Sequence, residues 1–240
     1  MQDSLPVRFA IGALLLGLMI IFSVLWNELQ KEKEIDQRKE EAEKLSRDAE
    51  LFKLRQQLQP HFLFNSLNSI NALIGSRPQE AKEMVQKLSE FLRGTLRKDD
   101  QQRVKLEEEL HHLQLYLDIE KVRFGHRLIT EINCEPDAMK MDMPALLLQP
   151  IVENAIKFGL YDTTDAVTIQ IRAAAQNQQL IITVQNPFDP ETSAPNKGTG
   201  FGLASVQRRL SLLFGRSDLL ETSAVEKVFT TTVKIPQRTT

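Results

Sequence analysis

The hydrophobic pattern begins with a long apolar stretch near the N-terminus. Residues 9–26 are eighteen consecutive residues without a charged side chain. As a helix that rises about 1.5 Å per residue, this stretch would be roughly 27 Å long, close to the thickness of the hydrocarbon core of a bilayer. We therefore expect residues 1–26 to form a short tail and a transmembrane helix. A cleaved signal peptide is the alternative, but no small-residue cleavage site follows Trp26.

The next stretch is highly charged. Residues 27–50 are dominated by Glu, Lys, Gln and Arg, with apolar residues near heptad spacing. This predicts a short coiled-coil connector, and a single solvated helix is the alternative. Basic residues close to the apolar stretch favour a cytoplasmic location for the rest of the chain. We therefore expect a single-pass protein of the inner membrane, anchored by residues 9–26, with its catalytic part in the cytoplasm.

Residues 51–100 predict two amphipathic helices joined by a short turn. The first continues into Pro60, and Ser76 with Pro78 marks the start of the second. The second helix has apolar residues at i, i+3, i+4 and i+7 spacing, namely Met84, Val85, Leu88, Phe91, Leu92 and Leu96. A lone hairpin buries too little apolar surface to be stable, so we expect two copies to pair as a four-helix bundle. The predicted assembly is a homodimer.

Residues 101–240 predict an α+β domain. A stripe of leucines from Leu106 onward indicates a helix that ends at Gly125. Residues with period-two alternation predict strands at 167–171, 180–184 and 229–235, and residues 127–133 are a shorter candidate. Helical segments are predicted at 145–158 and 202–214. Helices segregated from consecutive strands favour a two-layer α/β sandwich over a parallel doubly wound sheet.

Composition narrows the possible partners. The chain has 30 Lys and Arg against 32 Asp and Glu, with a net charge of −2. This balance gives no electrostatic basis for binding DNA or RNA, so we expect no direct nucleic-acid partner. Cys134 is the single cysteine and cannot form an intrachain disulfide, which suits a reducing compartment. We expect it to be a buried small apolar residue.

A histidine stands at the start of the first predicted hairpin helix. His61 and Asn65 are four residues apart, so they share one helical face. A neutral imidazole can offer one ring nitrogen as a nucleophile to a phosphoryl group, and an amide one turn away can hydrogen-bond the other nitrogen. A plain surface or core histidine is the alternative.

Two further motifs suggest a nucleotide site. Glu153, Asn154 and Lys157 share a helical face, and together they offer oxygen ligands for a metal and positive charge for phosphates. The alternative is a helix whose polar face simply meets water. The second motif is a glycine loop that leads into the last predicted helix, where backbone N–H groups could bind phosphate. Its residues are Gly198, Gly200 and Gly202, followed by Leu203.

Order and spacing together resemble the LytS-type sensor histidine kinases, from about Leu54 to the C-terminus. The matching segments are Pro60-His61-Phe62-Leu63-Phe64-Asn65, then Tyr116-Leu117-Asp118-Ile119-Glu120 with Arg123-Phe124, then Gln149-Pro150-Ile151-Val152-Glu153-Asn154-Ala155-Ile156-Lys157, and the glycine loop running into Arg209-Leu210. The resemblance implies an ATPase domain of the GHKL, or Bergerat, fold that uses ATP and Mg²⁺. It also implies a response regulator as the partner that receives the phosphoryl group.

The same resemblance assigns roles to individual residues. It implies that His61 accepts the γ-phosphoryl group of ATP, that Asn154 holds Mg²⁺ and that Glu153 is the polarising or general-base residue. Phe62 follows the histidine where many other histidine kinases carry an acid. Lys157 and the glycine loop would contact the phosphates.

One segment departs from the family pattern. The family usually has Asp-x-Gly-x-Gly after a strand, where the Asp binds the amino group of adenine, but this chain reads Asn186-Pro187-Phe188-Asp189-Pro190. Asn186 could accept the same hydrogen bond through its amide oxygen, without the added strength that a charge provides. Two alternative functions follow: a pseudokinase or scaffold that dimerises and binds a regulator, and a GHKL ATPase without phosphotransfer.

Overall fold

The computed structural model describes residues 60–97, 102–160, 165–188 and 201–237, together with Met19 and Trp26. The chain divides into two compact units, residues 1–56 and residues 57–240. All the elements below belong to the second unit. The predicted coiled coil lies outside the described residues, as does the predicted membrane span apart from Met19 and Trp26. In the described part of the chain, no helix is both long and apolar enough to cross a membrane.

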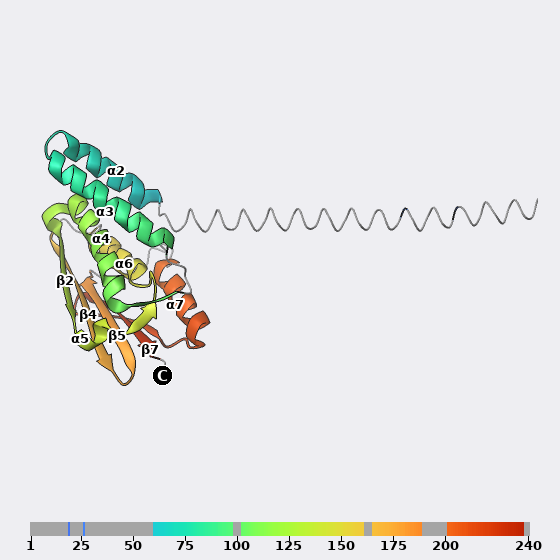
Figure 1. Cartoon of the computed structure of the whole chain (residues 1–240). Coiled ribbons are helices and arrows are strands. Elements are labelled where there is room, and N and C mark those ends of the chain that lie inside the picture. Colours follow the sequence, from blue (N-terminus) through green and yellow to red (C-terminus); the bar gives the residue numbers. More distant parts are fainter. Residues whose placement is uncertain are drawn as a thin grey trace, which may run out of the picture. The chain divides into compact units, whose positions relative to one another are not determined.

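Two helices joined by a short turn open the second unit (Figure 1). They are α2 (Pro60–Ile74) and α3 (Pro78–Arg97). Helix α3 begins at a proline, where the missing N–H costs no helical hydrogen bond. Their buried positions recur every three or four residues. These positions are Phe62, Ser66, Ile70 and Leu73 on α2, and Ala81, Met84, Leu88, Phe91 and Thr95 on α3. The predicted hairpin is therefore present.

Helix α4 (Leu106–Phe124) packs against both hairpin helices. It ends at Gly125, as predicted, and this glycine has φ 60 and donates its N–H to the Lys121 carbonyl. A short 3-10 turn, Gly125–Arg127, leads into the sheet. Three short elements had no signal in the sequence. They are β1 (Arg103–Lys105) and β3 (Asp142–Pro144), which pair with each other, and α5 (Pro136–Met139).

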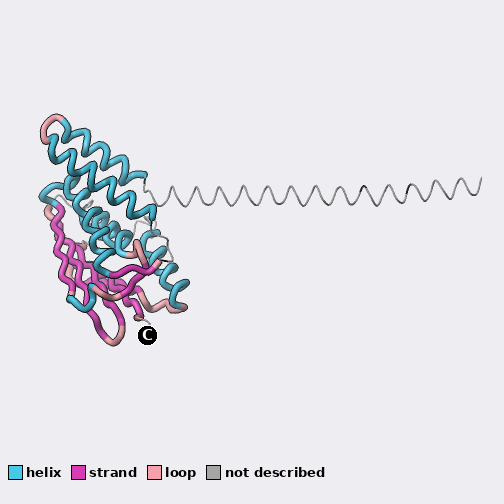
Figure 2. The backbone as a smooth tube through the Cα atoms, in the orientation of Figure 1, coloured by secondary structure: helices cyan, strands magenta, loops and turns pink. Residues whose placement is uncertain are grey.

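A mixed sheet of five strands forms the second layer (Figure 2). Its order is β2-β4-β5-β7-β6, with β2 parallel to β4 and every other pair antiparallel. The strands are β2 (Leu128–Cys134), β4 (Val167–Gln176), β5 (Gln179–Pro187), β6 (Leu220–Val225) and β7 (Val228–Pro236). Helices α4, α6 (Leu148–Leu160) and α7 (Phe201–Phe214) lie on one side of this sheet. The α+β architecture is therefore confirmed.

Three details differ from the expectation. Strand β6 was not predicted, because its residues are exposed or half-buried and show no alternation. The helix predicted over 145–158 begins at Leu148, because the chain turns at Leu146, which has φ 55. Cys134 is half-buried at the end of β2 rather than buried.

Candidate functional site

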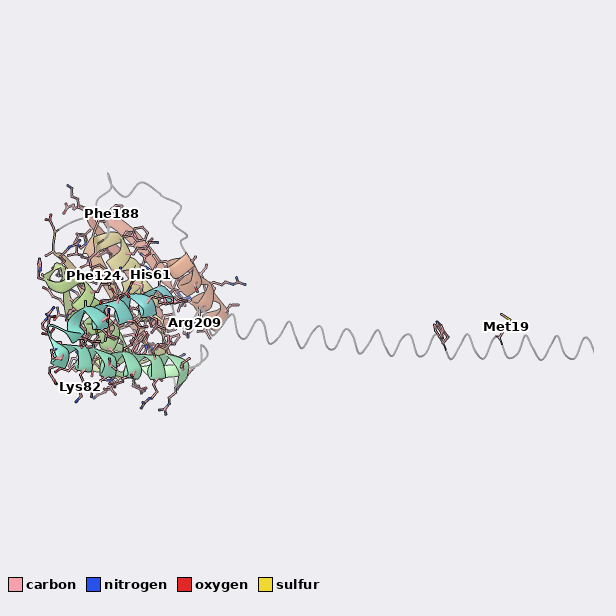
Figure 3. The ribbon with its side chains drawn as sticks, turned by 90° about the horizontal axis from the view of Figure 1, so that it is seen from above. Met19, His61, Lys82, Phe124, Phe188 and Arg209 are labelled. Carbon is pink, nitrogen blue, oxygen red and sulfur yellow. The ribbon has the colours of Figure 1, made fainter. Side chains whose placement is uncertain are left out.

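His61 lies in the first turn of α2 with its side chain exposed (Figure 3). Asn65 lies one turn further along the same face, and its Nδ2 is 3.2 Å from Nδ1 and 3.3 Å from Nε2 of the imidazole. A neutral imidazole has one acceptor nitrogen, so the amide can donate to only one of the two. The predicted pairing of these side chains is present. The ring nitrogen that accepts from this NH₂ group is the one that carries the lone pair, so this hydrogen bond must be released when that nitrogen attacks a phosphoryl group.

The residue after His61 is buried. Phe62 is 5% exposed, and its ring centroid lies 5.2 Å from that of Phe91 on α3 and 5.2 Å from that of Tyr116 on α4. Consecutive helical positions point about 100° apart, so burial of Phe62 and exposure of His61 are compatible. Sequence reasoning treated Phe62 as a departure from other kinases and gave it no structural role.

The start of α6 is held by a buried carboxylate from α4. Glu109 is 1% exposed and accepts hydrogen bonds from the backbone N–H of Leu146 at 2.9 Å and of Leu148 at 3.1 Å. A carboxylate at this place satisfies N–H groups that have no partner within the helix and complements the helix dipole. Sequence reasoning missed Glu109, since it is the last of three consecutive glutamates. Its spacing from Leu106 and Leu113 could have indicated that it faces inward.

The predicted polar face of α6 is present. Gln149 Nε2 donates to Glu153 Oε1 at 2.9 Å. Asn154, one residue later, is half-buried, and Lys157 is exposed with its Nζ 5.6 Å from the centre of the Phe158 ring. These residues offer two kinds of oxygen ligand and a cation on one helix.

Each end of α6 approaches another predicted site residue. At the start of the helix, a Cβ placed on Gly202 of α7 would lie 3.6 Å from the Pro150 carbonyl oxygen. At the other end, a Cβ placed on Gly159 would lie 3.9 Å from Cβ and Nδ2 of Asn186 on β5. Helix α6 therefore connects the glycine motif with Asn186, and Asn154 lies between them along the helix. Gly198 and Gly200 lie outside the described residues, whereas Gly202 and Leu203 are half-buried in the first turn of α7.

Asn186 has a defined amide orientation. It is 3% exposed, and its Nδ2 donates to the Pro187 carbonyl oxygen at 2.8 Å. The amide oxygen is then the group that can accept a hydrogen bond from a ligand. This orientation suits an amino group such as that of adenine.

Glu120 is a buried carboxyl that sequence reasoning quoted within a motif but gave no role. It is 4% exposed, and its Oε2 lies 3.6 Å from Nη1 of Arg123. Burial raises the pKa of Glu120 to about 7; Arg123 opposes the shift, and the Glu153 carboxylate adds to it. Two carboxyl groups from α4 and α6 are therefore electrostatically coupled beside the polar face of α6.

Comparison with known proteins identifies the group. The histidine kinase family model matches residues 49–128. The sensor histidine kinase BtsS of Escherichia coli K12 is 38% identical over 170 residues, which cover 70% of this chain and 29% of BtsS. The sensor protein LytS of Streptococcus agalactiae serotype V is 32% identical over 212 residues, which cover 83% of this chain and 36% of LytS. The chain belongs to the LytS-type sensor histidine kinase family.

The chain spans about a third of the length of these LytS-type relatives. Among solved structures, the Acinetobacter baumannii histidine kinase AdeS aligns with a TM-score of 0.44 at 15% identity, over 74% of this chain and 96% of the AdeS chain. A structural similarity at this level is weak, so membership of the LytS-type family rests on the sequence relatives.

Proposed function

We propose that this chain is a homodimeric sensor histidine kinase that uses ATP to phosphorylate His61 and then passes the phosphoryl group to an aspartate of a response regulator. The observation that carries the proposal is the arrangement around α6, which brings Gly202 to one end of the helix and Asn186 to the other. An exposed His61 in the same compact unit supplies the acceptor.

The residues around α6 fit a magnesium–ATP complex. In this proposal Asn154 holds Mg²⁺, and Lys157 and the backbone of the glycine motif contact the phosphates. The amide oxygen of Asn186, which is the acceptor of this side chain, accepts a hydrogen bond from adenine, while the amide NH₂ donates to the Pro187 carbonyl. Bound Mg²⁺ would neutralise charge on the phosphates. The domain would then be an ATPase domain of GHKL type.

Positioning and electrostatic stabilisation would supply most of the catalysis in the proposed reaction. A ring nitrogen of His61 forms a bond to the γ-phosphorus as the bond to the β-phosphate bridging oxygen breaks, and ADP leaves. The imidazole then loses the proton on its other nitrogen. Asn65 orients the ring, and Glu153 is the proposed polarising or general-base residue, itself oriented by Gln149.

Dimerisation is supported by apolar side chains that α2 and α3 leave in solvent. Phe64 is 67% exposed and Leu67 is 49% exposed. Ile74 on α2, and Val85 and Leu96 on α3, are also large exposed apolar residues. Pairing of two hairpins would bury them, as in a four-helix bundle.

The proposed location is the inner membrane, with residues 9–26 as a single-pass anchor and the catalytic part in the cytoplasm. The support for this is the uncharged stretch in the sequence, long enough as a helix to cross the hydrocarbon core. A cytoplasmic response regulator would then reach His61 directly.

The decisive test is labelling of the full chain with γ-labelled ATP and Mg²⁺. We expect a label that is labile in acid and stable in base, lost in His61→Gln because no nucleophile remains, and strongly reduced in Asn154→Asp. A label that persists in His61→Gln would rule out this residue as the acceptor.

The pseudokinase alternative is favoured by one observation, the replacement of the usual Asp-x-Gly-x-Gly by Asn186-Pro187-Phe188. A nucleotide that binds the folded state must raise its stability. Thermal unfolding with and without Mg²⁺ and ATP therefore separates the two functions. A kinase requires a nucleotide-dependent rise in the unfolding temperature, and a scaffold that does not bind nucleotide shows none.

A further inference from the structure

The strand end that carries Asn186 also carries an aromatic pair. In the antiparallel pairing of β5 with β7, Phe229 is the direct partner of Asn186, so the two side chains lie on the same face of the sheet. Phe188 follows Asn186 by two residues. Its N–H donates to the Lys227 carbonyl oxygen at 2.7 Å, which continues the pairing beyond Pro187. Phe188 therefore lies on that face as well.

This face of the sheet is the one on which α6 packs. A Cβ placed on Gly159 of α6 would lie 3.9 Å from Cβ of Asn186. The inward-facing side chains of β5 are buried up to this point, and the last two of them are Val184 and Asn186. Phe188 and Phe229 are only half-buried. The covered part of this face thus ends beside Asn186, where two aromatic side chains stay partly accessible.

The chemistry of the pair suits a flat heterocycle. The rings of Phe188 and Phe229 have their centroids 5.9 Å apart and their planes 45° apart. Phenylalanine side chains offer apolar ring surface and no hydrogen-bond donor, so they give a phosphate group nothing to bind. A nucleobase gains free energy from contact with aromatic rings. Of the parts of ATP, the base is therefore the one that fits this pair.

Asn186 by itself is a weak anchor for a base. Its side chain is an uncharged amide, and a hydrogen bond to an amide oxygen is about half as strong as one to a carboxylate. Much of that strength is offset by the loss of hydrogen bonds to water. Firm binding of a base next to Asn186 therefore needs further contacts, and Phe188 and Phe229 lie on the same face to supply them.

We propose that Phe188 and Phe229 form the wall of the base subsite, and that ring contact with this pair supplies more of the affinity for the base than the hydrogen bond to Asn186 does. The inference rests on the proposed kinase function and adds two binding residues to it. The pair contacts the base and not the reacting phosphate. Its loss should therefore weaken binding of ATP without slowing the chemical step.

The test uses the full chain in detergent carrying Phe188→Leu or Phe229→Leu, which keep an apolar side chain and remove the ring. The matched control is Phe214→Leu, at a half-buried phenylalanine that packs on the core at the end of α7. We expect loss of either ring to weaken the binding of ATP with Mg²⁺ by about tenfold, and the control to bind like the wild type. At saturating ATP, all the proteins should label His61 at the wild-type rate.

Two further variants separate contact with the base from a merely structural role. Phe188→Tyr keeps the ring and should keep the wild-type affinity for ATP. In Phe188→Trp, the indole would contact the base, so ATP should reduce its fluorescence. The wild type, whose single tryptophan is Trp26, should show no such loss. Inorganic tripolyphosphate, which has no base, should leave the fluorescence of both proteins unchanged.

Unchanged ATP affinity in both leucine variants would overturn the aromatic wall and leave the kinase function intact. Higher affinity would show that the rings occupy the place of the base, which also overturns the proposal. Weaker binding that Phe188→Tyr does not restore, with no fluorescence loss in Phe188→Trp, would reduce the pair to a structural role. Absence of ATP binding in the wild type would overturn the kinase function and this inference with it.

Discussion

At the scale of single residues, the buried carboxyl of Glu120 makes stability depend on pH. Burial raises its pKa from 4.5 to about 7, so the folded state holds the proton more tightly than the unfolded chain. Stability is therefore lost as pH rises from 4.5 to about 7, and the full penalty remains above that. A pKa difference of 7 − 4.5 = 2.5 corresponds to about 3 kcal/mol at most.

Glu120→Gln should remove this penalty. We expect the variant to be more stable than the wild type by about 1–3 kcal/mol at pH 8, and by much less at pH 5. Urea unfolding of the full chain at the two pH values measures the difference. The control is Glu108→Gln on the exposed side of the same helix, where the carboxyl stays in water. An equal gain at both pH values would show that the carboxyl charge is not responsible.

The sequence predicts some site residues better than others. The pairing of His61 with Asn65 follows from helical spacing alone, and so does the shared face of Glu153 and Lys157. The burial of Phe62 and the inward direction of Glu109 do not follow, because both depend on which neighbouring helix covers that face. Residues that hold a site together are harder to find than residues that line it.

At the scale of elements, the start of α6 depends on α4. Glu109→Gln should replace one acceptor oxygen by an amide NH₂ that cannot accept from the N–H of Leu146 or Leu148. A buried donor left without its acceptor costs about 1–3 kcal/mol, and we expect a loss of stability in that range.

Denaturant unfolding checks this prediction, with Glu107→Gln as the control on the exposed face of the same turn. Stabilisation by Mg²⁺ and ATP should also fall in Glu109→Gln, because Pro150 in the first turn of α6 lies next to Gly202 of the glycine motif. If the two variants unfold alike, Glu109 does not hold the start of α6.

The hydrophobic pattern of the sequence predicted the helices and strands that have one buried face. Strands β4, β5 and β7 alternate because one face of each strand is more deeply buried than the other, and the hydrophobic pattern predicted them. Strand β6 lies at the edge of the sheet with most side chains in solvent, so it carries no alternation to detect. The position of the turn before α6 is decided by a partner on α4, which lies about 37 residues earlier in the chain.

At the scale of the whole molecule, the exposed apolar residues of the hairpin are expected to be the dimer interface. Phe64→Glu combined with Leu67→Glu should place charges where two copies meet. Loss of two buried apolar side chains per copy costs several kcal/mol, so the dimer should dissociate at a concentration at least about tenfold higher than the wild type does.

Analytical ultracentrifugation of the full chain in detergent measures this shift. The matched control is Leu212→Glu on α7, another exposed leucine, at 78% exposure, that lies outside the hairpin. We expect the control to dissociate like the wild type. A double hairpin variant that also behaves like the wild type would locate the dimer contacts elsewhere.

Helix α6 also sets a fixed distance between its two contacts, that of Pro150 with Gly202 and that of Gly159 with Asn186. Pro150 and Gly159 are nine residues apart, which is about 13.5 Å of helix, and backbone hydrogen bonds keep that length fixed. A ligand that contacts Gly202 and Asn186 at once must match this length, since neither end can move toward the other without breaking the helix. Selection at such a site is by molecular length as well as by chemistry, and a base or a phosphate alone can occupy only one end.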